Sequence, residues 1–362
     1  MAAPARDSHG PEPIDWRLAE RVARNIAGRD AFADSYLASS LRPDFVAATA
    51  DAEAAVAEYT GLISAGCATA EVVDRAGWVA ANVRSMRRML EPLTDRVAEK
   101  MARSPLAPVA RRVAGTELGV LLGYVSQRVL GQYDLLVPDE DGAPTDDRVY
   151  YVGANILGLE KRFAFRPGDF RLWIALHEVT HRAQFTGVPW LRDYFLAQVH
   201  ELVGGIEPDP GMVFAAIGRV ADAVRQGQSP VGERGLVGLF GTADQQVAMD
   251  RMQALMSLLE GHGNAVMNQL GAHMLEGQER MASVLSARRN VRGATAILHR
   301  LMGLDMKMRQ YEVGEAFVDA VTDQAGFRAL DAAWRGPEYL PTLAELTAPT
   351  DWLARVGRVL AS

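Results

Sequence analysis

Residues 172–185 read Leu-Trp-Ile-Ala-Leu-His-Glu-Val-Thr-His-Arg-Ala-Gln-Phe. Apolar residues recur in this stretch every three or four positions, a period that predicts an amphipathic helix. The face expected to enter the core carries Leu172, Ala175, Leu176, Val179 and Ala183. The neighbouring face carries Trp173, His177, Thr180, His181 and Gln184. We therefore expect a buried helix at the centre of the fold, with two histidines on one side of it.

The ends of this helix are marked by residues that favour helix termini. Asp169 is a good N-cap residue, Gly187 stands at the usual position of a helix stop, and Pro189 follows it. We expect the helix to run from Phe170 to about Phe185.

The pattern His177-Glu178-x-x-His181 predicts a zinc site. Two histidines four residues apart lie one above the other on a helix, so both imidazoles can reach one metal ion. A catalytic zinc needs three protein ligands and one open position. Glu178 could then take a proton from zinc-bound water, whose pKa the metal lowers to about 7. The alternative is a pair of core or surface histidines that bind no metal.

A third ligand must come from another part of the chain, and Glu260 is the preferred candidate. On a helix it would share an otherwise apolar face with Met249, Met252, Met256, Gly263 and Met267. A buried carboxylate needs a metal or a charged partner, so a salt bridge to an arginine is the alternative. Gly261 and Gly263 would let another helix come close.

Four further polar residues are weaker candidates. Glu201 follows His181 in the chain and is the alternative third ligand, with His200 beside it nearly as well placed. An ordinary exposed glutamate near a helix end would explain Glu201 equally well. His262 and Tyr311 could stabilise an oxyanion, although packing or capping would also account for them.

Convincing strands occur only near the middle of the sequence. Tyr133–Val137 and Arg148–Leu157 are β-like runs that could pair as a hairpin. Arg148–Leu157 could also bind extended substrate as an edge strand, or it could serve structure alone. Near the N-terminus, Asp15 is expected to cap a helix that ends at Gly28.

The remaining chain is expected to be mainly helical. Helical spacing of apolar residues places further helices at 44–62, 78–101, 109–132, 191–203, 211–226, 243–270, 277–289, 294–301 and 305–323. We expect a disordered start at residues 1–13, a helical bundle at 14–104 and a catalytic region at 105–362.

Composition argues against several classes of protein. The net charge is -7 and no basic run interleaves with aromatic residues, so nucleic acid is a poor partner. The single cysteine, Cys67, can form neither an internal disulfide nor a cysteine zinc site. The most apolar stretch, Leu118–Leu130, is too short to span a bilayer, and residues 1–13 lack an apolar signal segment. We expect a soluble cytoplasmic protein that binds no membrane, and the oligomeric state stays open.

Several segments resemble one protein family. Residues 172–185 and Gly187–Leu191 resemble an actinobacterial family of zincin-like metallopeptidases that is often labelled as associated with biosynthesis of the deazaflavin coenzyme. The resemblance extends to residues 129–134, 150–156, 259–262 and 307–312. Ala154 stands where the family has a proline, a departure that affects no ligand.

The resemblance implies a zincin-like fold with extra helices, a zinc ion and a hydrolase activity. It favours Glu260 over Glu201 as the third ligand, although the separation of Glu201 from His181 also occurs among zincins with a glutamate ligand. The resemblance implies no particular substrate.

We therefore expect a mainly α fold with a small β-sheet or hairpin, in which an N-terminal helical bundle packs on a zincin-like metallohydrolase core. The expected reaction is zinc-dependent hydrolysis of a peptide or small amide, with Glu178 activating water. One alternative is a non-catalytic protein that binds zinc for structure or holds a peptide in its groove. Another is a small-molecule amidohydrolase linked to deazaflavin coenzyme metabolism.

Overall fold

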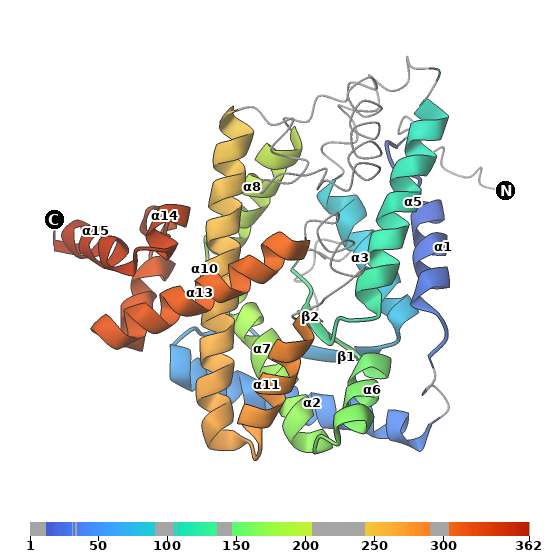
Figure 1. Ribbon diagram of the computed structural model, residues 1–362, viewed down its shortest axis with the longest axis horizontal. Helices are drawn as coiled ribbons and strands as arrows, with labels where there is room; N and C mark the ends of the chain where they lie inside the picture. Colours follow the sequence, from blue (N-terminus) through green and yellow to red (C-terminus); the bar gives the residue numbers. More distant parts are fainter. Residues whose placement is uncertain are drawn as a thin grey trace.

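The computed structural model describes residues 12–30, 32, 35–90, 105, 107–135, 147–204, 243–289 and 304–361. These residues form a mainly helical fold with one small three-stranded sheet, which confirms the predicted fold class. Figure 1 shows the sheet near the middle of the view with helices around it. Within the described residues, no helix is both long enough and apolar enough to cross a membrane.

The first helix has the predicted boundaries. α1 spans Trp16–Ala27, and the Asp15 side chain accepts a hydrogen bond from the Leu18 N–H at its start. Gly28 ends the helix at a φ of 71°, a conformation that glycine adopts without strain.

A row of glycines brings α5 (Ala107–Ser126) close to α1. A Cβ atom at any of three α5 positions would lie 2.5–2.6 Å from an atom of α1 or its cap: Gly115, Gly119 and Gly123. With α3 (Arg75–Met89), these helices enclose a small apolar core around Trp16 and Trp78. Residues 91–104, which include the predicted domain boundary, lie outside the described residues.

α2 (Tyr36–Thr60) begins earlier than the predicted start at residue 44 and contains Pro43. The Ser35 side chain caps its first turn, which explains how the helix starts ahead of the proline. α2 packs along the central helix α7 (Pro167–Gly187) and places Phe45 in the main core.

The sheet has the strand order β1-β3-β2. β2 (Gly131–Tyr133) and β3 (Arg148–Val152) pair antiparallel, as expected for the two β-like runs. The predicted bounds of the first strand, Tyr133–Val137, are wrong: α5 ends at Ser126 rather than at residue 132, and β2 ends where the predicted strand begins. β1 (Thr69–Val73) pairs parallel with β3. The sequence patterns do not reveal β1, since its partner lies far along the chain and a parallel pair has no tight turn that could announce it.

β3 ends at Val152, so the prediction of a strand as far as Leu157 is wrong. The chain turns there into α6 (Gly153–Phe163). Ile156 and Leu157 are both buried, and a short run of apolar residues does not distinguish a buried strand from a buried helix. β3 is also the central strand, so it cannot be the edge strand that was expected to bind substrate.

α7 is the predicted central helix, but both of its ends differ from the prediction. It begins at Pro167 with Arg166 in the N-cap position, whereas Asp169 lies in the first turn, where its charge favours the helix N-terminus. The helix also continues through Gly187 and has no left-handed residue at its end. Gly187 provides room instead: a Cβ there would lie 3.2 Å from Leu62 Cβ.

The helices after α7 follow the predicted positions closely. They are α8 (Leu191–Gly204), α10 (Ala243–Met274), α11 (Gln278–Arg289) and α13 (Leu304–Ala325). Short elements follow: η2 (Phe327–Trp334), η3 (Pro337–Tyr339), α14 (Leu343–Leu346) and α15 (Pro349–Ala361). The predicted helices at 211–226 and 294–301 lie outside the described residues.

The long helices α10 and α13 cross in Figure 1. They meet at a pair of glycines, Gly261 and Gly314. A Cβ at Gly261 would lie 2.3 Å from the backbone carbonyl of Gly314, and a Cβ at Gly314 would lie 1.9 Å from the Ser257 carbonyl oxygen. The two backbones are therefore in direct contact. This contact fixes the rotation of α10 and with it the direction of Glu260.

Replacing Gly314 with alanine should lower the free energy of unfolding by about 1–3 kcal/mol, as overpacking typically does. The reason is the overlap of the new methyl group with the Ser257 carbonyl oxygen. Urea unfolding followed by circular dichroism measures the change. Gly357→Ala is the matched control, because no atom lies within 4 Å of that Cβ position in α15 and alanine favours a helix. Equal stability of the two variants would contradict the tight crossing.

Candidate metal centre

His177 and His181 lie one turn apart on α7 and point to the same side. Their Nε2 atoms are 3.2 Å apart and their rings are nearly perpendicular, at 84°. Both side chains are mostly but not fully buried, at 19% and 16% exposure. The helical spacing of four thus produces the arrangement expected from the sequence, with two imidazole nitrogens directed at one point.

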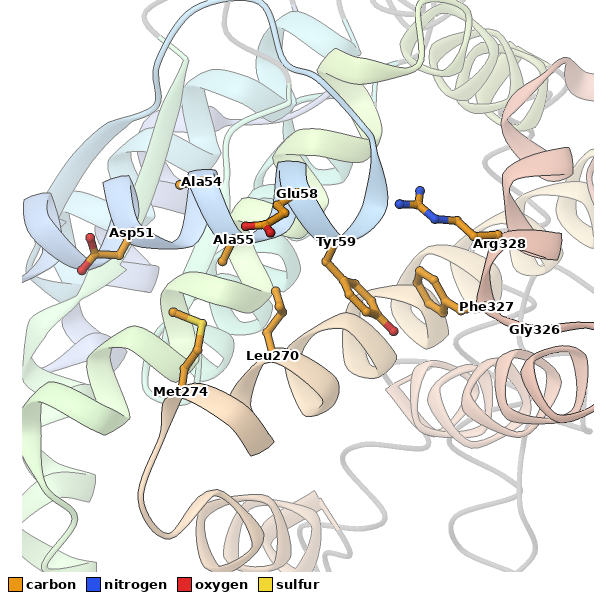
Figure 2. A pocket seen from close by; sticks show the side chains of 10 residues that line it. All are labelled: Asp51, Ala54, Ala55, Glu58, Tyr59, Leu270, Met274, Gly326, Phe327 and Arg328. Atoms are coloured by element: carbon orange, nitrogen blue, oxygen red, sulfur yellow. The ribbon is translucent and has the colours of Figure 1, made fainter.

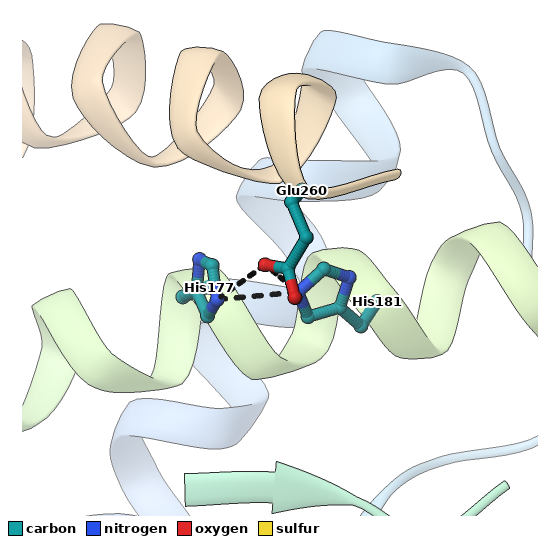
Figure 3. A group of neighbouring side chains, drawn as sticks. All are labelled: His177, His181 and Glu260. Atoms are coloured by element: carbon teal, nitrogen blue, oxygen red, sulfur yellow. Dashed lines mark hydrogen bonds and ion pairs between the residues drawn. The ribbon is translucent and has the colours of Figure 1, made fainter. Parts of the chain in front are cut away.

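Glu260 reaches the same point from α10, as Figure 3 shows. Its Oε2 atom is 3.4 Å from Nε2 of His181 and 3.7 Å from Nε2 of His177. The ligand atoms of these three residues lie within 4.8 Å of one another, and no other such cluster occurs in the part of the chain that the structure describes.

Gly263 makes this approach possible, because it is the residue of α10 that lies next to both imidazoles. A Cβ at Gly263 would lie 3.2 Å from Cε1 of His181 and 3.7 Å from Cε1 of His177. Any larger residue would fill the space next to the rings. Both Gly261 and Gly263 therefore permit close helix packing, as predicted from the sequence.

The other candidate ligands are not part of the cluster. Glu201 and His200 lie near the end of α8, and both are exposed to solvent. The structure brings Glu260, and neither of these two, together with the imidazoles of α7. The Tyr311 side chain lies outside the described residues.

Glu178 is not one of the three clustered side chains, but it lies close enough for its charge to act on His181. It is buried, and its side chain packs on the edge strand β2, where a Cβ at Gly131 would lie 2.5 Å from Cγ of Glu178. Gly131 therefore leaves the space that the Glu178 side chain occupies. The sequence pattern does not indicate this role, because the spacing of apolar residues predicts a helix that includes residue 131.

Gln184 contacts Nδ1 of His181, the ring nitrogen that faces away from the cluster, and so orients the ring. The sequence pattern does not predict this contact. The Gln184 side-chain nitrogen donates to the Leu259 carbonyl oxygen at 3.0 Å and lies 3.0 Å from Nδ1 of His262. Its oxygen consequently faces Nδ1 of His181, also at 3.0 Å. His181 then carries its hydrogen on Nδ1 and presents Nε2 to the cluster. The only sequence signal was the place of Gln184 on the polar face of the helix.

His262 lies in the layer behind Gln184. Its side chain is 1% exposed, stacks on Phe327 at 5.5 Å and meets the edge of Trp334 at 5.2 Å. Burial, and to a lesser extent the nearby charge of His181, lower the pKa of His262 to about 3, so the ring is neutral. This position gives no support to the expected oxyanion role and indicates a role in holding Gln184.

Phe327, which stacks on His262, also lines a groove. Figure 2 shows the side chains that line it, from α2, the end of α10 and the start of η2. Its volume is about 890 Å³. Tyr59 and Leu270 line it beside Phe327, and Asp51, Glu58 and Arg328 provide its charges. His177, His181 and Glu260 are not among the residues that line this groove.

Arg182 ties α7 to the rest of the protein next to the site. The side chain is 1% exposed and forms ion pairs with Glu53 at 2.7 Å and Asp147 at 2.6 Å. Asp147 also accepts a hydrogen bond from the Tyr133 hydroxyl of β2 at 2.9 Å. The helix that carries the histidines and the strand that contacts Glu178 are therefore held by a common buried network.

In the absence of a metal, the cluster favours a proton on His181. Burial alone would lower the pKa of this ring, but the hydrogen bond and charge of Glu260 outweigh it and raise the pKa to about 9. A cation and this proton would compete for the same nitrogen, since metals bind neutral imidazole.

Zinc uptake by the metal-free protein at pH 7 should release about one proton per chain, because His181 with its pKa of about 9 is protonated at that pH. The apparent zinc affinity should rise about tenfold per pH unit up to about pH 9 and level off above it. Calorimetric titrations in buffers of different ionisation enthalpy measure the proton count. A count near zero at pH 7 would contradict the raised pKa.

Comparisons with known proteins show which family the chain belongs to. A search among curated proteins found no match. A crystal structure from Chloroflexus aurantiacus, described as a "putative hydrolase with a novel fold", is similar at 30% sequence identity and a TM-score of 0.67, over 95% of this chain and 99% of the other. The family profile for zincin-like metallopeptidases matches residues 14–353. The chain therefore belongs to the zincin-like metallopeptidase family.

Proposed function

We propose that this protein is a zinc-dependent hydrolase that cleaves amide bonds. The observation that carries the proposal is the convergence of Glu260 on the imidazoles of His177 and His181, with Glu178 on the same helix but outside the cluster. Membership of the zincin-like metallopeptidase family and the name given to the similar crystal structure support the proposal.

The three side chains fit a catalytic zinc better than a structural one. Two imidazole nitrogens and one carboxylate oxygen are ligands that zinc accepts, and three protein ligands leave one position open. A structural site is usually closed by four protein ligands, and no fourth potential ligand joins the cluster among the described residues. This favours an enzyme over a protein that holds zinc for structure alone.

Glu178 would perform the proton transfers. Bound zinc would polarise the amide carbonyl and lower the pKa of water at the open position to about 7. The Glu178 carboxylate would accept a proton from that water and later deliver a proton to the leaving amine nitrogen. Its contact with Gly131 holds the carboxylate in place, and Gln184 keeps His181 in the tautomer that binds a cation.

β2 is the strand that could align an extended substrate. Among the described residues it is an edge strand, paired only with β3. Val152 N–H donates to Leu130 and Asp134 N–H donates to Arg148, so in an antiparallel ladder the backbone groups of Gly131 face away from β3. A peptide could add to this edge next to Glu178. A small amide, including one linked to deazaflavin coenzyme metabolism, would not need the edge, and a screen of both substrate classes separates the two.

Purified protein should contain about one zinc per chain, because the histidine spacing forms one mononuclear site. His177→Ala and His181→Ala should each lose that zinc, as measured by elemental analysis after dialysis. His273→Ala is the control, since this histidine is exposed near the end of α10 and should not affect the metal. Zinc retained in both α7 variants would reject the site.

Glu260→Ala should lose zinc as strongly as the histidine variants, because it removes the only carboxylate in the cluster. Glu201→Ala should keep it, since Glu201 is exposed and outside the cluster. If Glu260→Ala kept zinc and Glu201→Ala lost it in the same metal analysis, the third ligand would be Glu201 of α8.

Glu178→Gln should keep the zinc and lose about 10²–10⁴-fold in hydrolysis, because glutamine has the same shape but cannot accept a proton. Glu201→Gln is the matched control and should retain the rate. The comparison uses initial rates on a substrate found by the screen. Full activity of Glu178→Gln would rule out the proposed base, whereas loss of zinc would show that Glu178 supports the metal site instead.

A further inference from the structure

Three aromatic side chains form a continuous cluster beside the edge strand β2. Tyr133 of β2 stacks on Phe185 of α7, with the ring centroids 6.4 Å apart. Phe195 of α8 meets Phe185 edge-on at 5.7 Å. All three side chains are only partly buried, so this aromatic cluster keeps some of its apolar surface exposed. The proton transfers proposed above use none of these residues.

Phe185 places the aromatic cluster on the side of α7 that carries the histidines. Residues four apart lie on the same face of a helix, so His177, His181 and Phe185 form one row along α7. The aromatic cluster therefore begins one helical turn beyond the proposed metal site.

β2 connects the aromatic cluster with Glu178. Gly131 and Tyr133 are two residues apart, and side chains at that spacing point to the same face of a strand. Glu178 occupies the space beside Gly131, while Phe185 contacts the ring of Tyr133. The Cα atoms of the two strand residues are about 7 Å apart along β2. One face of this strand thus meets the proposed base first and the aromatic cluster two residues later.

The hydrogen bonds of β2 decide which of its residues can pair with a substrate. The Leu130 carbonyl and the Asp134 N–H bond to β3, so the backbone groups of Gly131 and Tyr133 face the opposite edge. A peptide that continues the antiparallel order at that edge would pair with both residues. The peptide residue opposite Tyr133 then has its Cβ atom about 4.5–5.5 Å from that of Tyr133, on the same face of the sheet. Its side chain reaches the aromatic cluster.

We infer that the aromatic cluster of Tyr133, Phe185 and Phe195 selects peptides with a large apolar side chain at one fixed position, two residues before the residue that pairs with Gly131. The inference rests on the proposed function, because it names the substrate class of the same site. A phenylalanine, leucine or methionine at that position covers the partly exposed rings. The peptide residue between the two points to the other face of the strand and meets none of them.

A positional scan of peptide substrates tests the inference on the zinc-loaded full-length protein. The probe is a set of decapeptides of alanine, serine and glycine in which a single phenylalanine moves from position to position. Mass spectrometry gives the cleaved bond and the initial rate for each peptide. Phenylalanine at one fixed distance from the cleaved bond should raise kcat/KM about tenfold over alanine, and phenylalanine at either neighbouring position should not.

Variants of the aromatic cluster test whether these rings cause the preference. Phe185→Ala should reduce the tenfold preference to about twofold or less, because it removes the central ring of the cluster. Phe195→Ala is the second variant and should lower the preference in the same direction. Phe163→Ala is the matched control, since this partly buried ring of α6 stacks on Phe165 instead of on the cluster. It should keep the wild-type preference, and elemental analysis checks that every variant retains zinc.

Two results would overturn the inference. One is an equal rate for phenylalanine and alanine at every position in the wild type, and the other is a positional preference that both cluster variants leave unchanged. In either case the observed cleavage leaves the proposed function standing. If the zinc-loaded protein hydrolyses a small amide but no peptide of the set, the inference is rejected and the hydrolase stands. If it hydrolyses neither, both are rejected.

Discussion

The close approach of α10 to α7 is the constraint on which the site depends. α7 alone provides two imidazoles, and a cation there would lack a negative ligand. Gly263 removes the side chain that would hold the helices apart, and the contact of Gly261 with α13 fixes the rotation of α10. Together they bring the Glu260 carboxylate within 3.4 Å of His181. Burying the carboxylate charge next to two histidines costs free energy unless a proton or a metal ion compensates it. The packing of α10 on α7 therefore favours a bound cation at this position.

The sequence predicts a feature of the site well when all the residues that indicate it lie on one helix. The spacing of His177 and His181 needs only the α-helical period, and Glu260 is recognisable as a carboxylate on an apolar face. The parts that it misses depend on contacts between distant segments. β1 pairs with a strand far along the chain. The space at Gly131 is taken by the Glu178 side chain, which comes from a distant helix. α6 begins with a short run of apolar residues that could equally form a buried strand.

A second layer of residues explains why the ligands hold their positions without a metal. The Gln184 amide connects His181 with His262 and the Leu259 carbonyl, so an α7 ligand is tied to the α10 backbone. Arg182 connects α7 to Asp147, which also binds Tyr133 of the edge strand. The His262 ring contacts Phe327, Trp334 and Gln184. These contacts give no support to the oxyanion role of His262, which stays a prediction.

The central claim is that one zinc ion is held jointly by α7 and α10. The most direct measurement is a crystal structure of the zinc-loaded protein with anomalous data collected at the zinc absorption edge. The account predicts one strong peak between His177, His181 and Glu260, about 2.0–2.1 Å from each Nε2 atom and about 2.0–2.2 Å from a Glu260 oxygen. A peak beside Glu201 or His200 on α8, or no peak near the imidazoles, would contradict it.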